Sequence, residues 1–273
     1  MNIAQAWCQC RISIGLPGGD SMRGLRDKAI ILTGGASGIG REAAIRLGVE
    51  GAMVGIFDLD EAGARATVEQ IGSDRSAAYH VDISDREQVT TALAAFESRF
   101  GPTRGLANVA GWDSARLFMD SDPAVWDKVI RINLYGSLVM HHVVVRGMAE
   151  RGFGRVVNVS SDAGRVGSSG ESVYAACKGG IIAFTKTLAR ELARNGVILN
   201  VLCPGPTETP LFTDFTKDMP GGDRLAEGLA KAIPLRRLGQ PDDYAGMIAF
   251  LLSDDAAFMT GQTISISGGL TMS

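Results

Sequence analysis

The sequence predicts a single α/β domain built on a doubly wound, mostly parallel sheet of about seven strands, with helices on both faces. Short apolar runs of strand length alternate with segments of helical spacing along the chain. The apolar runs are continuous, which is typical of strands covered on both faces. No linker or internal repeat interrupts the alternation, and crossovers of this length between parallel strands are right-handed.

Each expected strand is an apolar run bounded by glycine or polar residues. We expect strands at residues 29–33, 52–57, 77–81, 106–109, 154–159, 197–202 and 262–267. The expected helices are indicated by apolar residues spaced three or four apart, as at Ile39, Ala43 and Leu47. We expect helices at residues 39–50, 60–71, 84–100, 123–151 in two pieces, 173–194 and 242–252.

The composition excludes several classes of protein. Of the 273 residues, 45% are hydrophobic and 21% are charged, which indicates a chain that buries a core rather than a disordered one. The net charge is −3 and no block of Lys or Arg occurs, so we expect no nucleic-acid partner. No apolar run reaches the roughly 18 residues of a membrane span, so we expect no membrane association.

We expect two parts in the chain, an extension at residues 1–22 and one domain at residues 23–273. Gly15, Pro17, Gly18 and Gly19 interrupt any regular element in the extension, which is loosely ordered or precedes a true start at Met22. Within the domain, residues 204–238 are rich in Pro, Gly and Thr and follow the sixth strand. Because ligands bind beyond the carboxyl ends of parallel strands, this segment is expected to be a substrate lid.

Cysteine and histidine are too sparse and scattered for a metal site. The candidates are Cys8, Cys10, Cys177, Cys203, His80, His141 and His142. Their spacing matches no common zinc or disulfide pattern, so we expect no metal, reduced cysteines and a cytoplasmic location. His141 and His142 lie in an apolar helical stretch, where packing or capping is the expected role.

A glycine-rich turn joins the first expected strand to the first helix. It reads Thr-Gly-Gly-Ala-Ser-Gly-Ile-Gly over residues 33–40, with key glycines at Gly34, Gly38 and Gly40. Glycine permits a tight turn and close approach of a pyrophosphate to the free N–H groups of the helix N-terminus. With the strand before it and the helix after it, the turn predicts a dinucleotide site.

Asp58 ends the second strand, where a carboxylate can accept hydrogen bonds from both ribose hydroxyls of an adenosine. It would repel a 2′-phosphate, and neither Ser37 nor Leu59 supplies a cation to bind one. The expected cofactor is therefore NAD rather than NADP. The alternative is that Asp58 only caps the following turn.

Tyr174 and Lys178 stand four apart on an expected helix and so share one face. An ammonium near a phenol lowers the phenol's pKa, which would give a general acid or base for an alcohol or carbonyl. Ser161 follows the fifth strand, where its hydroxyl could hold the reacting oxygen. Asn133, on a neighbouring helix, could hold a water that relays protons to Lys178.

These motifs together resemble the classical short-chain dehydrogenase/reductase family over residues 25–269, and the resemblance implies a Rossmann fold. Departures are Arg104 before the fourth strand and Val109 in Asn-Val-Ala-Gly. The resemblance implies a catalytic set of Asn133, Ser161, Tyr174 and Lys178 and a homotetramer. It implies cofactor contacts from Gly34, Ser37, Gly38, Ile39, Gly40, Asp58, Leu59, Asp82, Ile83, Asn108, Ala110, Gly111, Tyr174, Lys178, Pro204, Gly205, Thr207 and Thr209.

Segments around residues 110–113, 161–171, 203–211 and 267–272 further resemble dehydrogenases of the 2-hydroxycyclohexanecarboxyl-CoA type. That resemblance implies NAD-dependent oxidation of a ring hydroxyl beside a CoA thioester to a ketone. Two alternatives are a 3-oxoacyl-(acyl-carrier-protein) reductase and another alcohol or polyol dehydrogenase. A non-catalytic dinucleotide sensor is the alternative of another class, against which the intact catalytic set argues. Expected substrate contacts are Trp112, Asp113, Ser161 and Phe212.

Overall fold

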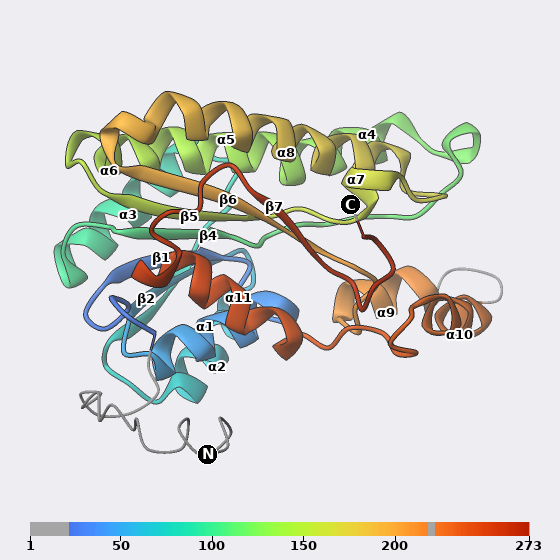
Figure 1. Ribbon diagram of the computed structural model, residues 1–273, viewed down its shortest axis with the longest axis horizontal. Helices are drawn as coiled ribbons and strands as arrows, with labels where there is room; N and C mark the ends of the chain where they lie inside the picture. The colour runs from blue at the N-terminus through green and yellow to red at the C-terminus, as the bar shows by residue number, and fades with distance from the viewer. Residues whose placement is uncertain (1–21, 218–221, 273) are drawn as a thin grey trace, which may run out of the picture.

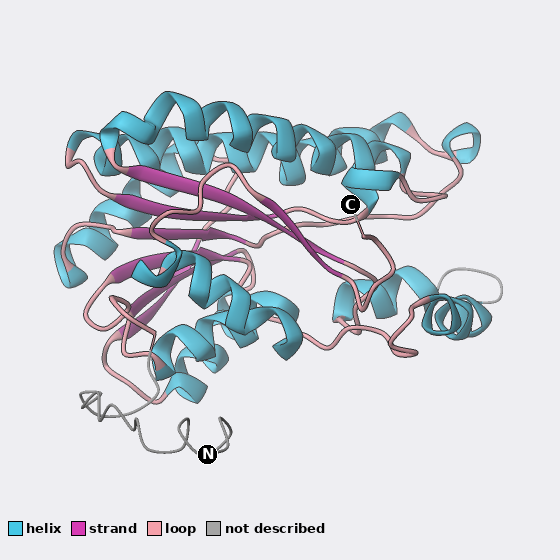
Figure 2. Ribbon diagram, viewed as in Figure 1, coloured by secondary structure: helices cyan, strands magenta, loops and turns pink. Residues whose placement is uncertain are grey.

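The computed structural model describes residues 22–217 and 222–272. One sheet of seven parallel strands forms the centre of the domain, in the order β3-β2-β1-β4-β5-β6-β7 (Figures 1 and 2). The strands are β1 (Ala29–Thr33), β2 (Met53–Asp58), β3 (Ser76–His80), β4 (Gly105–Asn108), β5 (Gly154–Val159), β6 (Val197–Pro204) and β7 (Thr263–Ile266). The predicted doubly wound fold is confirmed, and the sheet is wholly parallel.

Helices cover both faces of the sheet, as Figure 1 shows. On one face lie α1 (Gly38–Val49), α2 (Glu61–Ile71) and α11 (Asp242–Leu252). On the other lie α3 (Arg86–Phe100), a long helical run over residues 123–150, and α8 (Ser172–Leu192). Short 3-10 turns are η2 (Phe118–Asp120), η5 (Ala193–Asn195) and η6 (Asp254–Ala256).

The long run is continuous rather than split in two as expected. Its parts are α4 (Pro123–Ile130), the π-helical turn η3 (Arg131–Gly136), α5 (Ser137–Met140), a second π-helical turn η4 (His141–Val145) and α6 (Arg146–Glu150). A π turn contains an extra residue, so it shifts the spacing of apolar residues without ending the helix. That shift explains why the sequence pattern indicated an interruption.

Residues 204–238 are more regular than the sequence indicated, because they contain α9 (Pro210–Lys217) and α10 (Gly222–Ala232). Two backbone hydrogen bonds join the ends of this segment: Glu208 N–H donates to Gly239 O at 2.9 Å, and Gly239 N–H donates to Pro206 O at 2.9 Å. Figure 1 places both helices beyond the end of the sheet where β6 finishes. A short helix, α7 (Ala163–Val166), follows β5 and was not expected.

The sheet separates two apolar cores. Ile30, Leu32 and Ile56 point to the side of α1 and α11, where Leu47 and Ile248 are fully buried. The opposite core contains Ile31, Phe96, Met140 and Met148 among its buried members. No described helix is long and apolar enough to cross a membrane. The expected extension, with Cys8 and Cys10, lies outside the described residues, apart from Met22.

Candidate active site

The predicted site residues follow the carboxyl ends of the parallel strands. The glycine turn follows β1, Gly111 follows β4, Ser161 follows β5, and Gly205 follows β6. Because parallel strands all point the same way, these segments meet at one edge of the sheet. The chain therefore brings its expected cofactor and catalytic motifs to a common edge.

The glycine turn is packed too closely for side chains. Gly34 has φ +74°, and a Cβ there would lie 2.7 Å from both the N and the Cα of Ala110. A Cβ on Gly40 would lie 1.9 Å from the Gly34 carbonyl oxygen. The Thr33 hydroxyl accepts hydrogen bonds from Val109 N–H at 3.1 Å and Ala110 N–H at 3.2 Å. The segments after β1 and β4 are thus held against each other.

The N-terminus of α1 fits a diphosphate. Ser37 precedes the helix, its hydroxyl makes no capping hydrogen bond, and the first turn contains no acidic residue. A Cβ on Gly38 would lie 3.3 Å from Thr209 Cγ2, so the glycine also leaves room beneath the start of the lid. Free N–H groups at a twelve-residue helix, next to glycines without side chains, suit the diphosphate of a dinucleotide.

Asp58 braces the glycine turn as well as facing the expected ribose position. Its Oδ2 accepts from Ala36 N–H at 2.8 Å, and its Oδ1 accepts from Asp60 N–H at 2.9 Å. A carboxylate has about four acceptor positions, so capacity remains for ribose hydroxyls. Arg41, which the sequence analysis overlooked, donates to the Ala36 carbonyl oxygen. Its place in the first turn of α1 was the signal that could have identified it.

Other predicted cofactor contacts are placed less uniformly. The Asp82 carboxylate accepts from Ser84 N–H at 2.8 Å, and Leu59 is 64% exposed. Asn108 points into the interior, where its Nδ2 donates to Asn158 Oδ1 at 3.0 Å. Thr207 is buried, with its hydroxyl 2.6 Å from the hydroxyl of Tyr244. The side chains of Asn108 and Thr207 are thus already engaged within the protein.

The predicted catalytic residues lie close together. Lys178 is buried, its Nζ donates to the Val159 carbonyl oxygen at 3.0 Å, and it lies 5.4 Å from the centre of the Tyr174 ring. Ser161 is hydrogen-bonded to the Tyr174 phenol, and its Oγ also accepts from Ala163 N–H at 3.1 Å. Lys178 and Tyr174 are thus positioned by α8, and Ser161 by the turn that leads into α7.

Asn133 lies fully buried in the first π turn, where it holds the segment after β4. Its Nδ2 donates to Val129 O at 2.9 Å and Trp112 O at 2.6 Å, and its Oδ1 accepts from Trp112 N–H at 3.3 Å. A Cβ on Gly111 would lie 2.9 Å from Asn133 Oδ1 and 3.3 Å from Lys178 Nζ. The missing side chain at Gly111 therefore leaves space between Asn133 and Lys178.

The acidity of the site differs from the expectation that Lys178 lowers the pKa of Tyr174. Burial raises the pKa of the Tyr174 phenol, the carboxyls of Glu171 and Asp113 raise it further, and only Ser161 opposes them by a hydrogen bond to the phenol. Burial also lowers the pKa of Lys178 to about 8. The phenol is therefore protonated at neutral pH, ready to donate a proton.

The predicted substrate contacts lie on different elements. Lys128 Nζ lies 3.8 Å from the centre of the Trp112 ring, so a cation covers one face of the ring. Asp113 is partly buried beside Glu171 and Ser114. Phe212, in α9, donates its N–H to Thr209 Oγ1 at 3.2 Å. Contact of these side chains with substrate stays a prediction.

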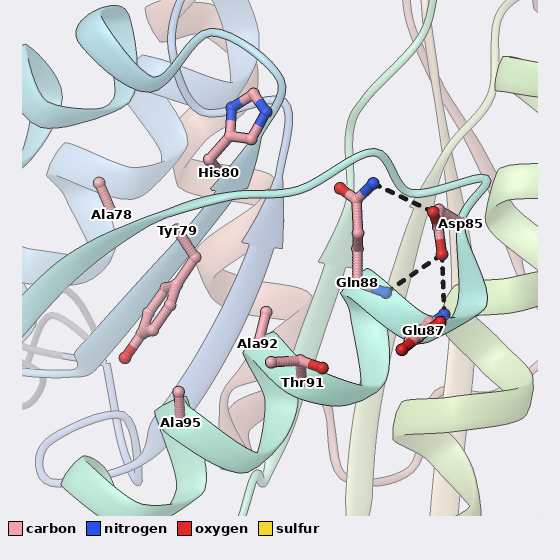
Figure 3. A pocket seen from close by; sticks show the side chains of 9 residues that line it. All are labelled: Ala78, Tyr79, His80, Asp85, Glu87, Gln88, Thr91, Ala92 and Ala95. Carbon is pink, nitrogen blue, oxygen red and sulfur yellow. Dashed lines mark hydrogen bonds between the residues drawn. The ribbon is translucent and has the colours of Figure 1, made fainter.

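Two cavities lie away from these residues. One, of 520 Å³, lies between the edge strand β3 and α3 (Figure 3). Its polar rim is used for helix capping, because Asp85 accepts from Glu87 N–H at 2.9 Å and from Gln88 N–H at 3.2 Å. The other, of 660 Å³, lies on the outer side of α5, η4 and α8. Neither is lined by a predicted site residue.

Comparison with known proteins finds similar sequences and a similar solved structure. A family model described as enoyl-(acyl carrier protein) reductase matches residues 34–271. Human (3R)-3-hydroxyacyl-CoA dehydrogenase is 34% identical over 259 residues, covering 91% of this chain and 97% of that protein. The 3-oxoacyl-(acyl-carrier-protein) reductase FabG of Vibrio cholerae is 36% identical over 248 residues, covering 91% and 99%.

Among solved structures, levodione reductase superposes with a TM-score of 0.84 at 32% identity, covering 89% of this chain and 97% of its own. Family model, relatives and structural neighbour thus point to the same family. The chain belongs to the short-chain dehydrogenase/reductase family and is an oxidoreductase that acts on CH–OH groups with a nicotinamide cofactor.

Proposed function

We propose that the protein is an NAD-dependent dehydrogenase of a hydroxyacyl thioester, with a ring 2-hydroxyacyl-CoA as the leading substrate. The observation that carries the proposal is the convergence of Ser161, Tyr174 and Lys178 next to the glycine turn. Relatives named for hydroxyacyl-CoA and 3-oxoacyl substrates support a thioester. The segments around residues 110–113 and 161–171 support a ring substrate by resemblance.

NAD is supported by the carboxylate of Asp58 at the end of β2. Its Oδ2 already accepts the Ala36 N–H of the glycine turn and its Oδ1 accepts the Asp60 N–H, which fixes the carboxylate at the end of β2. Fixed negative charge there favours two ribose hydroxyls and disfavours a 2′-phosphate. The expected contacts of Ser37, Ile39, Asp82 and Thr209 with the cofactor belong to the same proposal.

The residues divide the chemistry between orientation and proton transfer. A bound nicotinamide accepts the hydride during alcohol oxidation and supplies it during ketone reduction. Ser161 orients the reacting oxygen, while Tyr174 takes its proton in oxidation and returns it in reduction. Lys178, when protonated, stabilises the phenolate that oxidation requires. Asn133 positions the backbone of Trp112 by hydrogen bonds, and its side-chain oxygen borders the space beside Gly111.

We also propose a homotetramer. The cavity of 660 Å³ on the outer side of the helical layer is lined largely by apolar side chains, among them Leu138, Val145 and Leu188. Apolar surface of this kind in a helical layer is typical of an interface between copies of a chain.

The test is a steady-state assay with NAD and NADP. The substrates are 2-hydroxycyclohexanecarboxyl-CoA, a 3-hydroxyacyl-CoA, a 3-hydroxyacyl-(acyl-carrier-protein) and an unacylated secondary alcohol. We expect the highest kcat/KM with NAD and a CoA thioester. A preference for the carrier-protein substrate would identify a fatty-acid-type reductase instead. Turnover of the plain alcohol alone would refute the thioester proposal.

A further inference from the structure

Three polar side chains, on Asn133, Ser137 and His141, follow one another at a spacing of four along the long helical run; we call them the polar row. Asn133 Nδ2 donates to Val129 O at 2.9 Å. Ser137 Oγ donates to Asn133 O at 3.2 Å, and His141 Nδ1 lies 2.7 Å from Ser137 O. All three side chains are buried, and the mechanism above gives Ser137 and His141 no role.

The polar row supplies hydrogen bonds where the backbone pattern of the helix changes. Asn133 lies in η3 and His141 begins η4, and a π turn pairs residues five apart instead of four. The side chains provide donors at the four-residue spacing that the π turns interrupt. Because a carbonyl oxygen only accepts, His141 Nδ1 carries a proton and donates it to Ser137 O. Every donor of the row therefore points toward the N-terminal end of the run.

The other nitrogen of His141 connects the polar row to the sheet. Asn158, on β5, places its Nδ2 at 3.1 Å from His141 Nε2 and donates to it, because Nδ1 already holds the proton of the neutral ring. Asn158 Oδ1 in turn accepts from Asn108 Nδ2 at 3.0 Å. Asn108 is the last residue of β4, so the row is tied to the strand that leads into the active site.

The opposite end of the polar row holds the segment that follows β4. The Asn133 side chain pairs with both backbone groups of Trp112: Nδ2 donates to Trp112 O at 2.6 Å, and Oδ1 accepts Trp112 N–H at 3.3 Å. Residues 109–112 are thus held at both ends by one hydrogen-bonded circuit. A Cβ on Gly111 would lie 3.3 Å from Lys178 Nζ, so the circuit fixes backbone that borders the buried amine.

We propose that Ser137 and His141 are positioning residues for the reaction, because they fix the π turn of Asn133 and, through Asn133, the backbone beside Lys178. This inference rests on the proposed function, in which Lys178 stabilises the phenolate. Loss of either donor leaves a buried carbonyl without its side-chain partner, which loosens the turn. A displacement of about 1 Å can lower a rate about 10²-fold, so partial loosening should lower it about 10-fold.

The experiment removes one donor at a time, by Ser137→Ala and by His141→Leu. We expect each variant to lower kcat about 10-fold, with a smaller change in KM for the coenzyme, because the glycine turn is untouched. His141→Asn should recover most of kcat, because its amide nitrogen can replace Nδ1 as the donor to Ser137 O. Circular dichroism checks that each variant is folded.

Thr90→Ala is the matched control. Thr90 is exposed in α3, and its Oγ1 donates to Arg86 O at 2.7 Å, which is again the carbonyl four residues earlier. The variant therefore loses the same kind of hydrogen bond as Ser137→Ala, but far from the polar row. Its kcat should equal that of the wild type.

Coupling to Asn133 separates positioning from a general loss of stability. Residues that act as a unit have non-additive effects on kcat. Ser137→Ala should therefore change kcat little in an Asn133→Ala background, and the double variant Ser137→Ala/His141→Leu should resemble either single variant. Unchanged kcat in both single variants, or effects that multiply in the Ser137→Ala/His141→Leu double variant, would overturn the inference.

Hydrogen exchange separates this inference from the proposed function. Trp112 N–H donates to Asn133 Oδ1, so this amide should exchange about 10-fold faster in Ser137→Ala and His141→Leu than in the wild type or Thr90→Ala. Equal exchange in the wild type and both variants would overturn the inference whatever the substrate. The kinetic assays use the alcohol and coenzyme that the wild type turns over fastest. Absence of turnover with every hydroxyacyl thioester would refute the proposed function alone.

Discussion

Tyr174 shows how neighbouring groups set the direction of a proton transfer at a single residue. Burial, Glu171 and Asp113 all raise the pKa of its phenol, while the hydrogen bond with Ser161 lowers it. The phenol is therefore the stable form at neutral pH, which favours ketone reduction. Oxidation needs the phenolate, so its rate should rise with pH while the rate of reduction falls.

Tyr174→Phe removes the proton donor and changes the volume of the side chain little. We expect kcat to fall by about 10²–10⁴-fold in both directions, because positioned acid–base groups contribute that much. Binding of NAD, followed by fluorescence, should survive. Tyr135→Phe is the control, since Tyr135 is 51% exposed and on a different helical run. Retention of most of the activity in Tyr174→Phe would show that another group transfers the proton.

A substitution at Asp58 tests the predicted preference for NAD over NADP. Asp58→Ser removes the charge at the end of β2 and the charge-assisted hydrogen bonds that it would make to the ribose. KM for NAD should therefore rise about 10-fold, and the ratio of kcat/KM for NAD to that for NADP should decrease. Initial rates with both coenzymes measure this. Asp74→Ser, at an exposed position, serves as the control. Equal kcat/KM values for NAD and NADP in the wild type would contradict the assignment.

The expected lid, residues 204–238, is a segment whose ends are joined. Hydrogen bonds of Gly239 with Pro206 and Glu208 join the two ends of the segment that contains α9 and α10. Its expected function, closing over substrate, excludes water from the site. Within the described part of this segment, Phe212 supplies the aromatic side chain that can be tested.

Phe212→Ala should raise KM for the alcohol by about 10-fold, the cost of losing one partly buried aromatic contact, with a smaller effect on KM for NAD. Thr213→Ala, at the exposed neighbouring position, is the control. The two Michaelis constants are measured in one assay. Equal effects on alcohol and NAD would mean that this part of the lid does not close on substrate.

The elements differ in how far the sequence predicted them. Buried strands were the easiest: β1 and β5 end where their apolar runs end. The helical run over residues 123–150 was misjudged because its two π turns shift the apolar spacing. The motif predicted the positions of Tyr174 and Lys178. It could not predict the acidity of Tyr174, because Asp113 comes from a segment far along the chain.

At the scale of the whole molecule, one buried histidine connects the helical layer to the sheet. His141 Nδ1 lies 2.7 Å from Ser137 O. Asn158 Nδ2 lies 3.1 Å from His141 Nε2 and donates a hydrogen bond to it. This arrangement suits a neutral ring with its proton on Nδ1. Burial lowers the pKa of His141 to about 4.

The unfolded chain binds a proton at His141 below about pH 6.5, whereas the folded chain binds one only below about pH 4. The free energy of unfolding should therefore decrease by about 3 kcal/mol as the pH drops across that interval, so the folded protein becomes less stable. His141→Gln should lose less stability there, because an amide donates and accepts without titrating. Urea unfolding at several pH values measures this, with exposed His80→Gln as the control. Parallel pH curves for wild type and His141→Gln would contradict the account.

Assembly is the second property of the whole molecule. Leu188→Glu places a charge in the apolar cavity on the outer side of α8, and burying that charge in an interface is unfavourable. We expect sedimentation velocity to show a tetramer for the wild type and smaller species for the variant. Val49→Glu, 76% exposed at the end of α1, should stay tetrameric. A monomeric wild type would refute the assembly.

Arg116 N–H donates to Gly170 O at 2.9 Å, which joins the loop after β4 to the loop before α8 and limits how either loop can be rebuilt. An insertion or deletion on either side would slide one segment past the other and break this hydrogen bond. Transplanting a single loop from a relative should therefore give a poor enzyme, whereas transplanting both together preserves their register. The two loops form one module for engineering, and in evolution a change of length in one is expected to be accompanied by a change in the other.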